Sequence, residues 1–262
     1  GAYGTAEFWT EWFAEPEHVD PYDWLVSFED VGPALLSLLG DRLDVTILVV
    51  GAGNSPLSSE LFARGYRDLT NVDNCEAVVD AQRRRYPMLR WLVADVRSLP
   101  FDDQSFDVVL DKGCLDTMFC CVDPEAQVNS YVGEVRRVAR SRFVTFSCHD
   151  AETVRRSLRD PSWAVATVDL PNPRWPAIDV ETFQLALCEP AATRDALATL
   201  LQGAVARLGR LDDAAPVLLP TRLSHLERRA SGRRHSDLIA TQLGYDDDDG
   251  DGDGDGDGAG EI

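Results

Sequence analysis

The chain has 262 residues, of which 44% are hydrophobic, and it carries a formal net charge of −20. This length and composition predict a globular protein with one large core, and the acidic balance disfavours nucleic acid as a partner. No apolar run approaches the ~20 residues that cross a bilayer, and the first residues lack the pattern of a secretory signal, so we expect no membrane partner and a soluble, cytoplasmic protein.

Residues 1–40 begin the chain with a mixture of aromatic and acidic side chains. Four aromatic residues fall within sixteen positions, and carboxylates lie between and around them: Trp9, Trp12, Tyr22 and Trp24, with Glu7, Glu11, Glu15 and Asp23. These rings could belong to a core, but their mixture with acids is more typical of a cover over a site. We therefore interpret residues 1–40 as an aromatic lid segment.

Residues 41–190 alternate between apolar runs typical of strands and amphipathic helical patterns. The expected strands cover 45–50, 68–73, 89–96, 105–113, 141–148, 163–171 and 181–190, and the expected helices cover 56–66, 76–86, 127–139 and 151–159. The last two strands leave no room for a helix between them, which indicates a hairpin. The order predicts an α/β fold: a Rossmann-like, doubly wound seven-stranded sheet with an antiparallel last strand at its edge.

The chain ends in two segments of different composition. Residues 191–245 predict a helical extension that includes an arginine cluster at 228–234. Residues 246–262 form an acidic Asp/Gly tail that we expect to be disordered. An EF-hand is disfavoured, because counting back from Glu261 gives Gly250 where the loop needs its first aspartate. The opposite charges suggest the hypothesis that the tail binds the arginine cluster.

Polar residues follow four successive strands, where a doubly wound sheet binds its ligands. They are Gly51 and Gly53 after the first strand, Asp73 after the second, Asp95 and Val96 after the third, and Asp111 and Lys112 after the fourth. A dinucleotide fingerprint would need a third glycine where this chain has Pro56, so an NAD site is disfavoured. A nucleoside without phosphates, with its ribose hydroxyls bound by Asp73, fits this pattern better. The pattern therefore favours S-adenosyl-L-methionine.

With these motifs the chain resembles the class I, seven-strand methyltransferases, and within them the lysine methyltransferases of translation elongation factor 1-alpha and their relatives. The resemblance covers about residues 3–190. Its specific parts are "EFWTEWF", "PYDWL", "ILVVGAGNSPLSSELFARGYRDLTNVD", "LRWLVADVRSLPFDDQSFDVVLDKGCLDTM" and "RFVTFSC". One departure is "VARSRF" before the fifth strand, where the superfamily normally has a proline-glycine-glycine turn.

The resemblance implies a role for each matching position in holding S-adenosyl-L-methionine and its product S-adenosyl-L-homocysteine. Trp9, Phe13 and Trp24 would close over the cofactor, Gly51, Gly53 and Asn54 would form the loop beneath it, Asp73 and Asn74 would hold the ribose, Asp95 and Val96 the adenine, and Lys112 the methionyl end. Lys112 is the only lysine among 25 basic residues, although codon bias alone could account for that.

Asp111 and Asp116 bracket Lys112 and are the candidate catalytic residues. A lysine acceptor is mostly protonated at pH 7.4, which costs roughly 4 kcal/mol, so a carboxylate that orients the amine and takes its proton would help. Asp116 is favoured for the substrate side, although it could instead cap a helix. His149 is left out of the site, because a lone histidine at a strand end is usually ordinary.

The expected partner is a protein with an accessible lysine, with elongation factor 1-alpha as the candidate. Two alternatives stay open: a small-molecule N- or O-methyltransferase, since the cofactor half of the fold says little about the acceptor, and a non-catalytic binding module. The six cysteines form no CxxC pair, so we expect reduced thiols and no metal centre.

Overall fold

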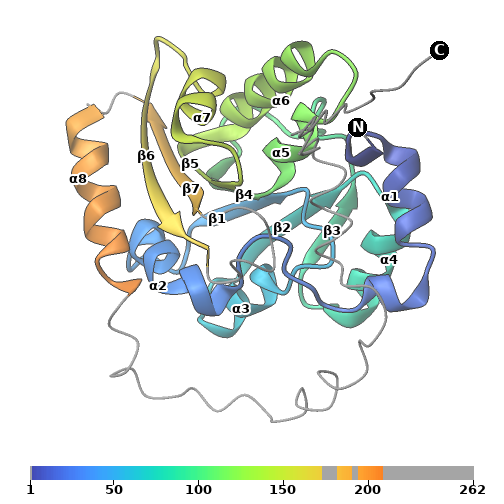
Figure 1. Cartoon of the computed structure of the whole chain (residues 1–262). Helices are drawn as coiled ribbons and strands as arrows, with labels where there is room; N and C mark the ends of the chain where they lie inside the picture. The colour runs from blue at the N-terminus through green and yellow to red at the C-terminus, as the bar shows by residue number, and fades with distance from the viewer. Residues whose placement is uncertain (1, 173–181, 191–193, 209–262) are drawn as a thin grey trace, which may run out of the picture.

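A computed structural model describes residues 2–172, 182–190 and 194–208 of the chain (Figure 1). The strands are β1 (Thr46–Val50), β2 (Asp68–Asp73), β3 (Arg90–Val93), β4 (Phe106–Lys112), β5 (Ala139–Ser147), β6 (Trp163–Pro171) and β7 (Thr182–Pro190). The helices are α1 (Ala6–Trp12), α2 (Phe28–Leu39), α3 (Leu57–Ala63), α4 (Glu76–Arg85), α5 (Cys114–Phe119), α6 (Pro124–Val138), α7 (Ala151–Ser157) and α8 (Arg194–Val205), with 3-10 turns η1 (Ala2–Gly4) and η2 (Pro16–Val19). The predicted tail 246–262 and the arginine cluster lie outside the described residues.

The seven strands form one sheet in the order β3-β2-β1-β4-β5-β7-β6. β1 to β5 pair in parallel, whereas β7 is antiparallel to both β5 and β6, which confirms the expected fold class and its antiparallel last strand. The expected edge position of that strand is wrong, because β7 returns between β5 and β6 and leaves β6 at the edge. Nine residue pairs join β6 and β7, consistent with the predicted hairpin.

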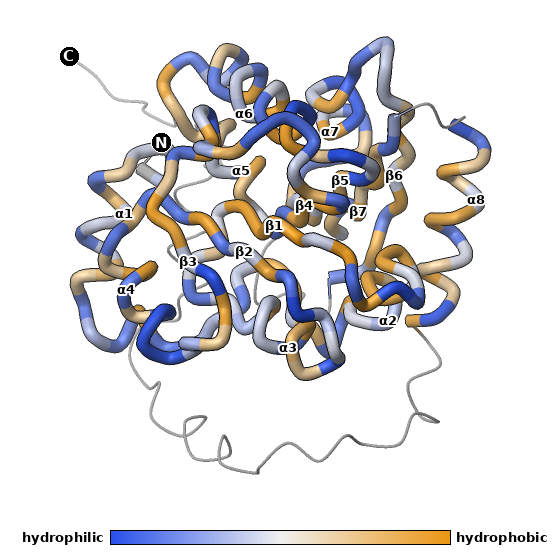
Figure 2. Tube along the Cα trace, turned by 180° about the vertical axis from the view of Figure 1, so that it is seen from behind, coloured by the Kyte–Doolittle hydropathy of each residue, from blue (hydrophilic) through white to orange (hydrophobic). Residues whose placement is uncertain are grey.

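Alternate residues of β1 are buried on opposite faces of the sheet, as the period-two geometry of a strand requires. Ile47 and Val49 of β1 pack with α2 and α3, while Leu48 and Val50 pack on the side of α5 and α6. Figure 2 shows β1 as hydrophobic along its length, and Figure 1 shows helices covering both faces. β1 is therefore central to the core, and its carboxyl end is held rigidly.

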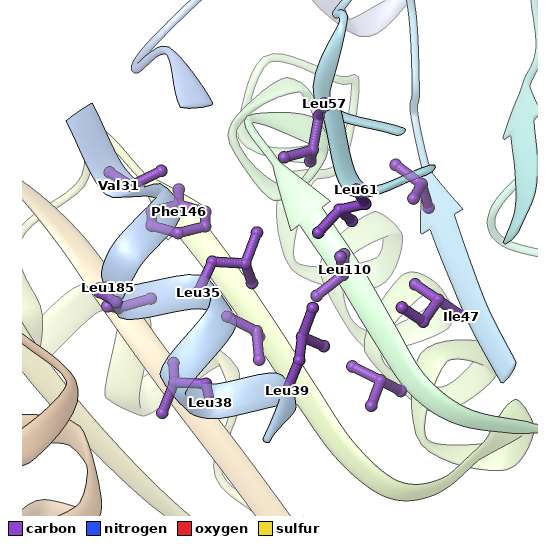
Figure 3. Packing of buried hydrophobic residues seen from close by; sticks show 14 of the residues in the cluster. Val31, Leu35, Leu38, Leu39, Ile47, Leu57, Leu61, Leu110, Phe146 and Leu185 are labelled. Atoms are coloured by element: carbon purple, nitrogen blue, oxygen red, sulfur yellow. The ribbon is translucent and has the colours of Figure 1, made fainter. Parts of the chain in front are cut away.

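Helix α2 lies within the predicted lid segment and belongs to the core. Ser27 and Asp30 form a capping box: the Ser27 hydroxyl accepts from the Asp30 amide, and the Asp30 carboxylate accepts from the Ser27 amide. Figure 3 shows Leu35 and Leu39 of this helix directed toward the sheet, where Phe146 and Leu110 lie. Each fully buried leucine contributes about 1.5–3 kcal/mol, so the helix fixes the start of the domain.

The loop expected before β5 is replaced by a direct passage from helix to strand. Val138 ends α6, and Ala139, at φ −80° and ψ 125°, already begins β5. This explains how the chain omits the proline-glycine-glycine turn. Within the described residues, no helix is both long and apolar enough to cross a membrane.

Candidate active site

A cavity lies at the carboxyl ends of β1, β2 and β4, and the lid segment forms one of its walls. Eleven of the thirteen predicted site residues line it: Trp9, Phe13, Trp24, Gly51, Gly53, Asp73, Asn74, Asp95, Val96, Lys112 and Asp116. Asn54 and Asp111 do not. The parallel register explains the convergence, because Val50 of β1 lies beside Val72 of β2 and Asp111 of β4, which brings the three strand ends to one edge.

The glycine loop after β1 turns sharply at two left-handed positions. Gly51 has φ +56° and Gly53 has φ +50°, a region that other residues rarely adopt. A Cβ at Gly51 would also stand 2.7 Å from Cys114, whereas a Cβ at Gly53 would meet no atom within 4 Å. Gly51 is therefore needed for packing, and Gly53 leaves open space at the cavity wall.

Asp73 ends β2 and fixes the glycine loop. One carboxylate oxygen accepts from the Gly53 amide at 2.9 Å, and the other accepts from the Cys75 amide at 3.0 Å. The side chain is almost completely buried, and this burial raises the pKa of Asp73, although the backbone hydrogen bonds act in the opposite direction. The carboxylate, with about four acceptor sites, keeps capacity for a further hydrogen bond from a ligand.

Asp95 is paired with Arg97, a cavity-lining residue that the sequence interpretation missed. The Arg97 guanidinium donates to both Asp95 oxygens, at 2.6–3.1 Å, and also donates to Gln127 Oε1 at 2.5 Å. The hydrogen bond from Arg97 is the main cause that lowers the pKa of Asp95. An arginine two residues after an aspartate was the available signal. This wall of the cavity therefore carries a neutralised carboxylate.

Asn54 anchors the lid segment instead of lining the cavity. Its side-chain amide donates to the carbonyls of His18, at 2.9 Å, and Asp20, at 2.6 Å, and its Oδ1 accepts from the Trp24 indole at 3.2 Å. Asn54 itself is only 2% exposed. Because all three partners belong to the lid segment, Asn54 fixes where that segment crosses the glycine loop.

The aromatic rings of the lid segment pack against one another at the cavity. Trp9 stacks on Phe13 with 5.9 Å between ring centroids and meets Trp24 edge to face at 5.4 Å. The Trp9 indole also donates to the carbonyl of Tyr3 at 2.9 Å. Tyr3, Gly4, Thr5 and Ala6 also line the cavity. The sequence pattern of this segment does not predict that position.

The carboxylate of Asp23 joins the lid segment to β4. Its Oδ1 accepts from Lys112 Nζ at 2.8 Å and from the Ser55 hydroxyl at 2.8 Å. The Lys112 side chain is 5% exposed and that of Asp23 is 10% exposed, so this ion pair is buried. The sequence identifies Asp23 only as one of several acids in the lid segment, because it gives no register between segments 89 residues apart.

Asp111 lies behind the cavity wall, and donors from the protein occupy the acceptor sites of its carboxylate. Its carboxylate accepts from the amides of Cys114 and Leu115 and from the hydroxyls of Tyr131 and Thr145, at 2.7–3.1 Å. Burial raises the pKa of Asp111 to about 7, with the charge of Asp116 as the second cause. Asp111 thus binds the first turn of α5, the helix that carries Asp116.

Asp116 lines the cavity from the first turn of α5. Its carboxylate accepts from the Ser147 hydroxyl at 2.5 Å and from the Cys148 amide at 3.3 Å, so it bonds to the end of β5 rather than capping its own helix. Burial raises the pKa of Asp116 to about 6. Cys148, another lining residue, was missed because its position at a strand end carried no distinguishing pattern.

The sequence comparisons agree with this geometry. Residues 48–145 match the model of a methyltransferase domain. Over 121 residues, the chain is 41% identical to the mouse protein named EEF1A lysine methyltransferase 4, an alignment that covers 44% of this chain and 46% of that protein. It is 28% identical over 190 residues to the human eEF1A lysine and N-terminal methyltransferase, covering 68% of this chain and 27% of that one. The chain thus matches less than half the length of these relatives.

A solved structure shares the fold. It is phosphoethanolamine N-methyltransferase 1 of Haemonchus contortus, in complex with phosphoethanolamine and S-adenosylhomocysteine. The TM-score is 0.51 at 16% identity, and the match covers 76% of this chain and 53% of that one. At this identity, the likeness concerns the fold alone.

Proposed function

We propose that this chain, which contains a class I S-adenosylmethionine-dependent methyltransferase domain, transfers a methyl group to a lysine side chain of a protein. The observation that carries the proposal is a nearly buried carboxylate, Asp116, which lines the same cavity as the predicted cofactor residues. Relatives named for lysine methylation of eEF1A support this acceptor and make elongation factor 1-alpha the candidate substrate. A cytoplasmic location is part of the proposal.

The residues around the cavity fit the cofactor. S-adenosylmethionine, when bound, would supply a methyl group on its sulfonium sulfur for in-line attack by a nucleophile, with S-adenosylhomocysteine as the leaving group. Asp73 lines the cavity with a carboxylate that can accept a hydrogen bond from the ribose hydroxyls, and Asn74 stands next to it. Gly53 leaves open space in which the backbone can approach a ligand. Val96 offers an apolar surface, and Asp95 a hydrogen-bond acceptor, for an adenine ring.

The lid segment would bind the rest of the cofactor and exclude water. Trp9, Phe13 and Trp24 provide apolar ring surface above the glycine loop. Lys112 presents an ammonium at the cavity that suits the carboxylate of the methionyl end, and its partner Asp23 holds it in position. Exclusion of water favours the neutral form of an incoming amine.

Asp116 is the group that we assign to the acceptor amine. Its carboxylate is held by Ser147 and Cys148 and can accept a hydrogen bond from the substrate nitrogen, which aims the nitrogen lone pair and provides a destination for its proton. The Asp111 carboxylate does not line the cavity and does not reach the substrate nitrogen. We assign it a positioning role, because it binds the first turn of the helix that carries Asp116.

A methyl-transfer assay tests the proposal. The purified chain is incubated with methyl-labelled S-adenosylmethionine and either purified elongation factor 1-alpha or cell lysate, and the labelled products are separated on a gel. We expect a labelled protein band, and mass spectrometry should place the methyl group on lysine. The Asp116→Asn protein should lose the label while still binding S-adenosylhomocysteine.

Other results would contradict parts of the proposal. A labelled small molecule without a protein band would favour a small-molecule methyltransferase of the same fold. S-adenosylhomocysteine binding without any labelled product would favour a non-catalytic module. Labelling of lysate proteins but not of elongation factor 1-alpha would reject the candidate substrate and retain the lysine activity.

A further inference from the structure

Three potential metal ligands of different chemistry meet at the end of β5. They are the carboxylate of Asp116 on α5, the thiol of Cys148 and the imidazole of His149. One ligand atom from each residue lies within 4.8 Å of the other two, and His149 Nε2 is 3.9 Å from Asp116 Oδ1. Coordination by one ion would require these atoms to approach one another by up to roughly 1.5 Å, since tetrahedral zinc ligands about 2.0–2.3 Å from the metal lie about 3.3–3.6 Å apart.

Hydrogen bonds hold the three residues as one unit. The Ser147 hydroxyl donates to Asp116 Oδ1, and the Cys148 amide donates to Asp116 Oδ2. The His149 amide donates to the Ser147 hydroxyl at 3.2 Å. The His149 ring also packs on Phe119, with 4.2 Å between ring centroids. The backbone of the strand end is therefore held against the Asp116 carboxylate, and side-chain movement of Cys148 and His149 would complete the coordination.

The set of donor atoms selects a class of metal. Thiolate sulfur, imidazole nitrogen and carboxylate oxygen together suit Zn²⁺ and similar borderline ions, whereas Mg²⁺ and Ca²⁺ prefer oxygen ligands alone. Three protein ligands leave the fourth tetrahedral position open. Asp116 and Cys148 both line the cavity, so we expect the open position to face it.

We propose that Asp116, Cys148 and His149 form a binding site for a zinc-class divalent cation at the wall of the active-site cavity. Coordination forms one bond from each ligand to the ion, and the Cys148 thiol releases its proton to solvent. An ion bound there occupies Asp116, the residue that the proposed function assigns to the acceptor amine. The ion therefore acts as a reversible inhibitor that competes with the acceptor rather than with S-adenosylmethionine.

Cobalt(II) provides a test that does not depend on methyl transfer. The metal-free 262-residue chain is titrated with cobalt(II) chloride while the absorption spectrum is recorded. We expect one equivalent to bind with the visible bands of a tetrahedral site and a thiolate-to-cobalt charge-transfer band. Added zinc sulfate should displace the cobalt and abolish both signals.

Matched variants assign the ligands. Cys148→Ser should lose the charge-transfer band, and His149→Gln should weaken binding at least tenfold. Cys120→Ser is the control, because Cys120 lines the same cavity but is not part of the cluster. If Cys148→Ser does not fold by circular dichroism, His149→Gln alone decides. Absence of cobalt binding in the wild type, or a band lost in Cys120→Ser and kept in Cys148→Ser, would overturn the site.

An inhibition assay separately tests whether the bound ion competes with the acceptor. Zinc should lower methyl transfer by the wild type, and a chelator should restore it. Higher acceptor concentration should relieve the inhibition, whereas higher S-adenosylmethionine should not. Zinc binding without inhibition would reject the competition with the acceptor and leave the metal site standing. An inactive enzyme that still binds cobalt would reject the proposed function but not the site.

Discussion

Lys112 Nζ lies 2.8 Å from Asp23 Oδ1, in a buried ion pair that joins the end of β4 to the lid segment. The only lysine of the chain is therefore tied to a residue 89 positions earlier, at the wall of the cavity. The arginine bias of the chain does not explain this position. An ammonium is a compact charge on an unbranched stem, which suits a narrow buried contact better than the planar fork of an arginine.

Replacing Asp23 with alanine should destabilise the protein. The change removes a carboxylate that faces a buried ammonium, and loss of one partner of a buried pair typically costs about 3–5 kcal/mol. Urea unfolding measures the effect. Asp44→Ala is the control, because its pair with Arg42 is 69–74% exposed and solvent screening leaves it little effect on stability. Equal losses in the two variants would contradict the role assigned to burial.

Alanine at the two loop glycines should have separable effects. Both variants place a side chain at positive φ, but only Gly51→Ala also puts its Cβ 2.7 Å from Cys114. Gly51→Ala should therefore lose several kcal/mol of stability, whereas Gly53→Ala should lose about 1–2 kcal/mol and chiefly weaken S-adenosylhomocysteine binding. Thermal unfolding and calorimetry measure the two effects. A larger loss of stability in Gly53→Ala would contradict this assignment.

Asp73→Ala should weaken the binding of S-adenosylhomocysteine by about 100-fold or more. Each hydrogen bond to a charged group contributes about 1.5–3 kcal/mol, and the two ribose hydroxyls would lose their acceptor. Isothermal titration calorimetry gives the dissociation constant. Asp80→Ala on the surface of α4 is the control and should bind normally. Unchanged affinity in Asp73→Ala would show that the ribose lies elsewhere.

The parallel strands and the residues at their ends could be predicted from sequence because both depend on local patterns. The apolar run before Gly51 and the alternation of elements determine which residues reach one edge of the sheet. Helix α2 was not predicted, although Ser27 and Asp30 have the capping-box spacing, because the mixture of aromatic and acidic residues in 1–40 favours a lid over a core helix. The position of β7 could not be predicted, because a hairpin pattern does not determine which of its two strands pairs with β5.

Side-chain direction was the part of the site that sequence could not supply. Asp111 and Asp116 are five residues apart and were both candidate catalytic residues, with Asp116 favoured for the substrate side, yet only Asp116 reaches the cavity. Their difference depends on Tyr131 and Thr145, distant residues whose hydroxyls bind Asp111. The pairing of Asp23 with Lys112 and the meeting of Cys148 with Asp116 are likewise tertiary contacts that no spacing encodes.

Asp116→Asn should abolish methyl transfer while leaving the fold and cofactor affinity nearly intact. Asparagine keeps the size of the side chain and can still accept from Ser147, but it cannot take a proton from the amine. We expect a loss of kcat of about 100-fold or more with S-adenosylhomocysteine affinity unchanged. Thr117→Ser, a neighbouring change at the cavity wall, is the control. Full turnover in Asp116→Asn would remove this residue from the mechanism.

The buried carboxyl of Asp111 should make the protein less stable as pH rises from about 4 to about 7. Burial raises its pKa from 3.8 to about 7, so the folded state binds more protons than the unfolded state across this window, and the free energy of unfolding falls with pH. One such group contributes at most about 1.4 kcal/mol per pH unit.

Urea unfolding across this range should show a smaller slope for Asp111→Asn than for the wild type, while Asp80→Asn should keep the wild-type slope. Because Asp116 shifts in the same direction, part of the slope should survive in Asp111→Asn. An identical slope in Asp111→Asn and the wild type would mean that Asp111 stays ionised in the core, with its four hydrogen-bond donors outweighing burial.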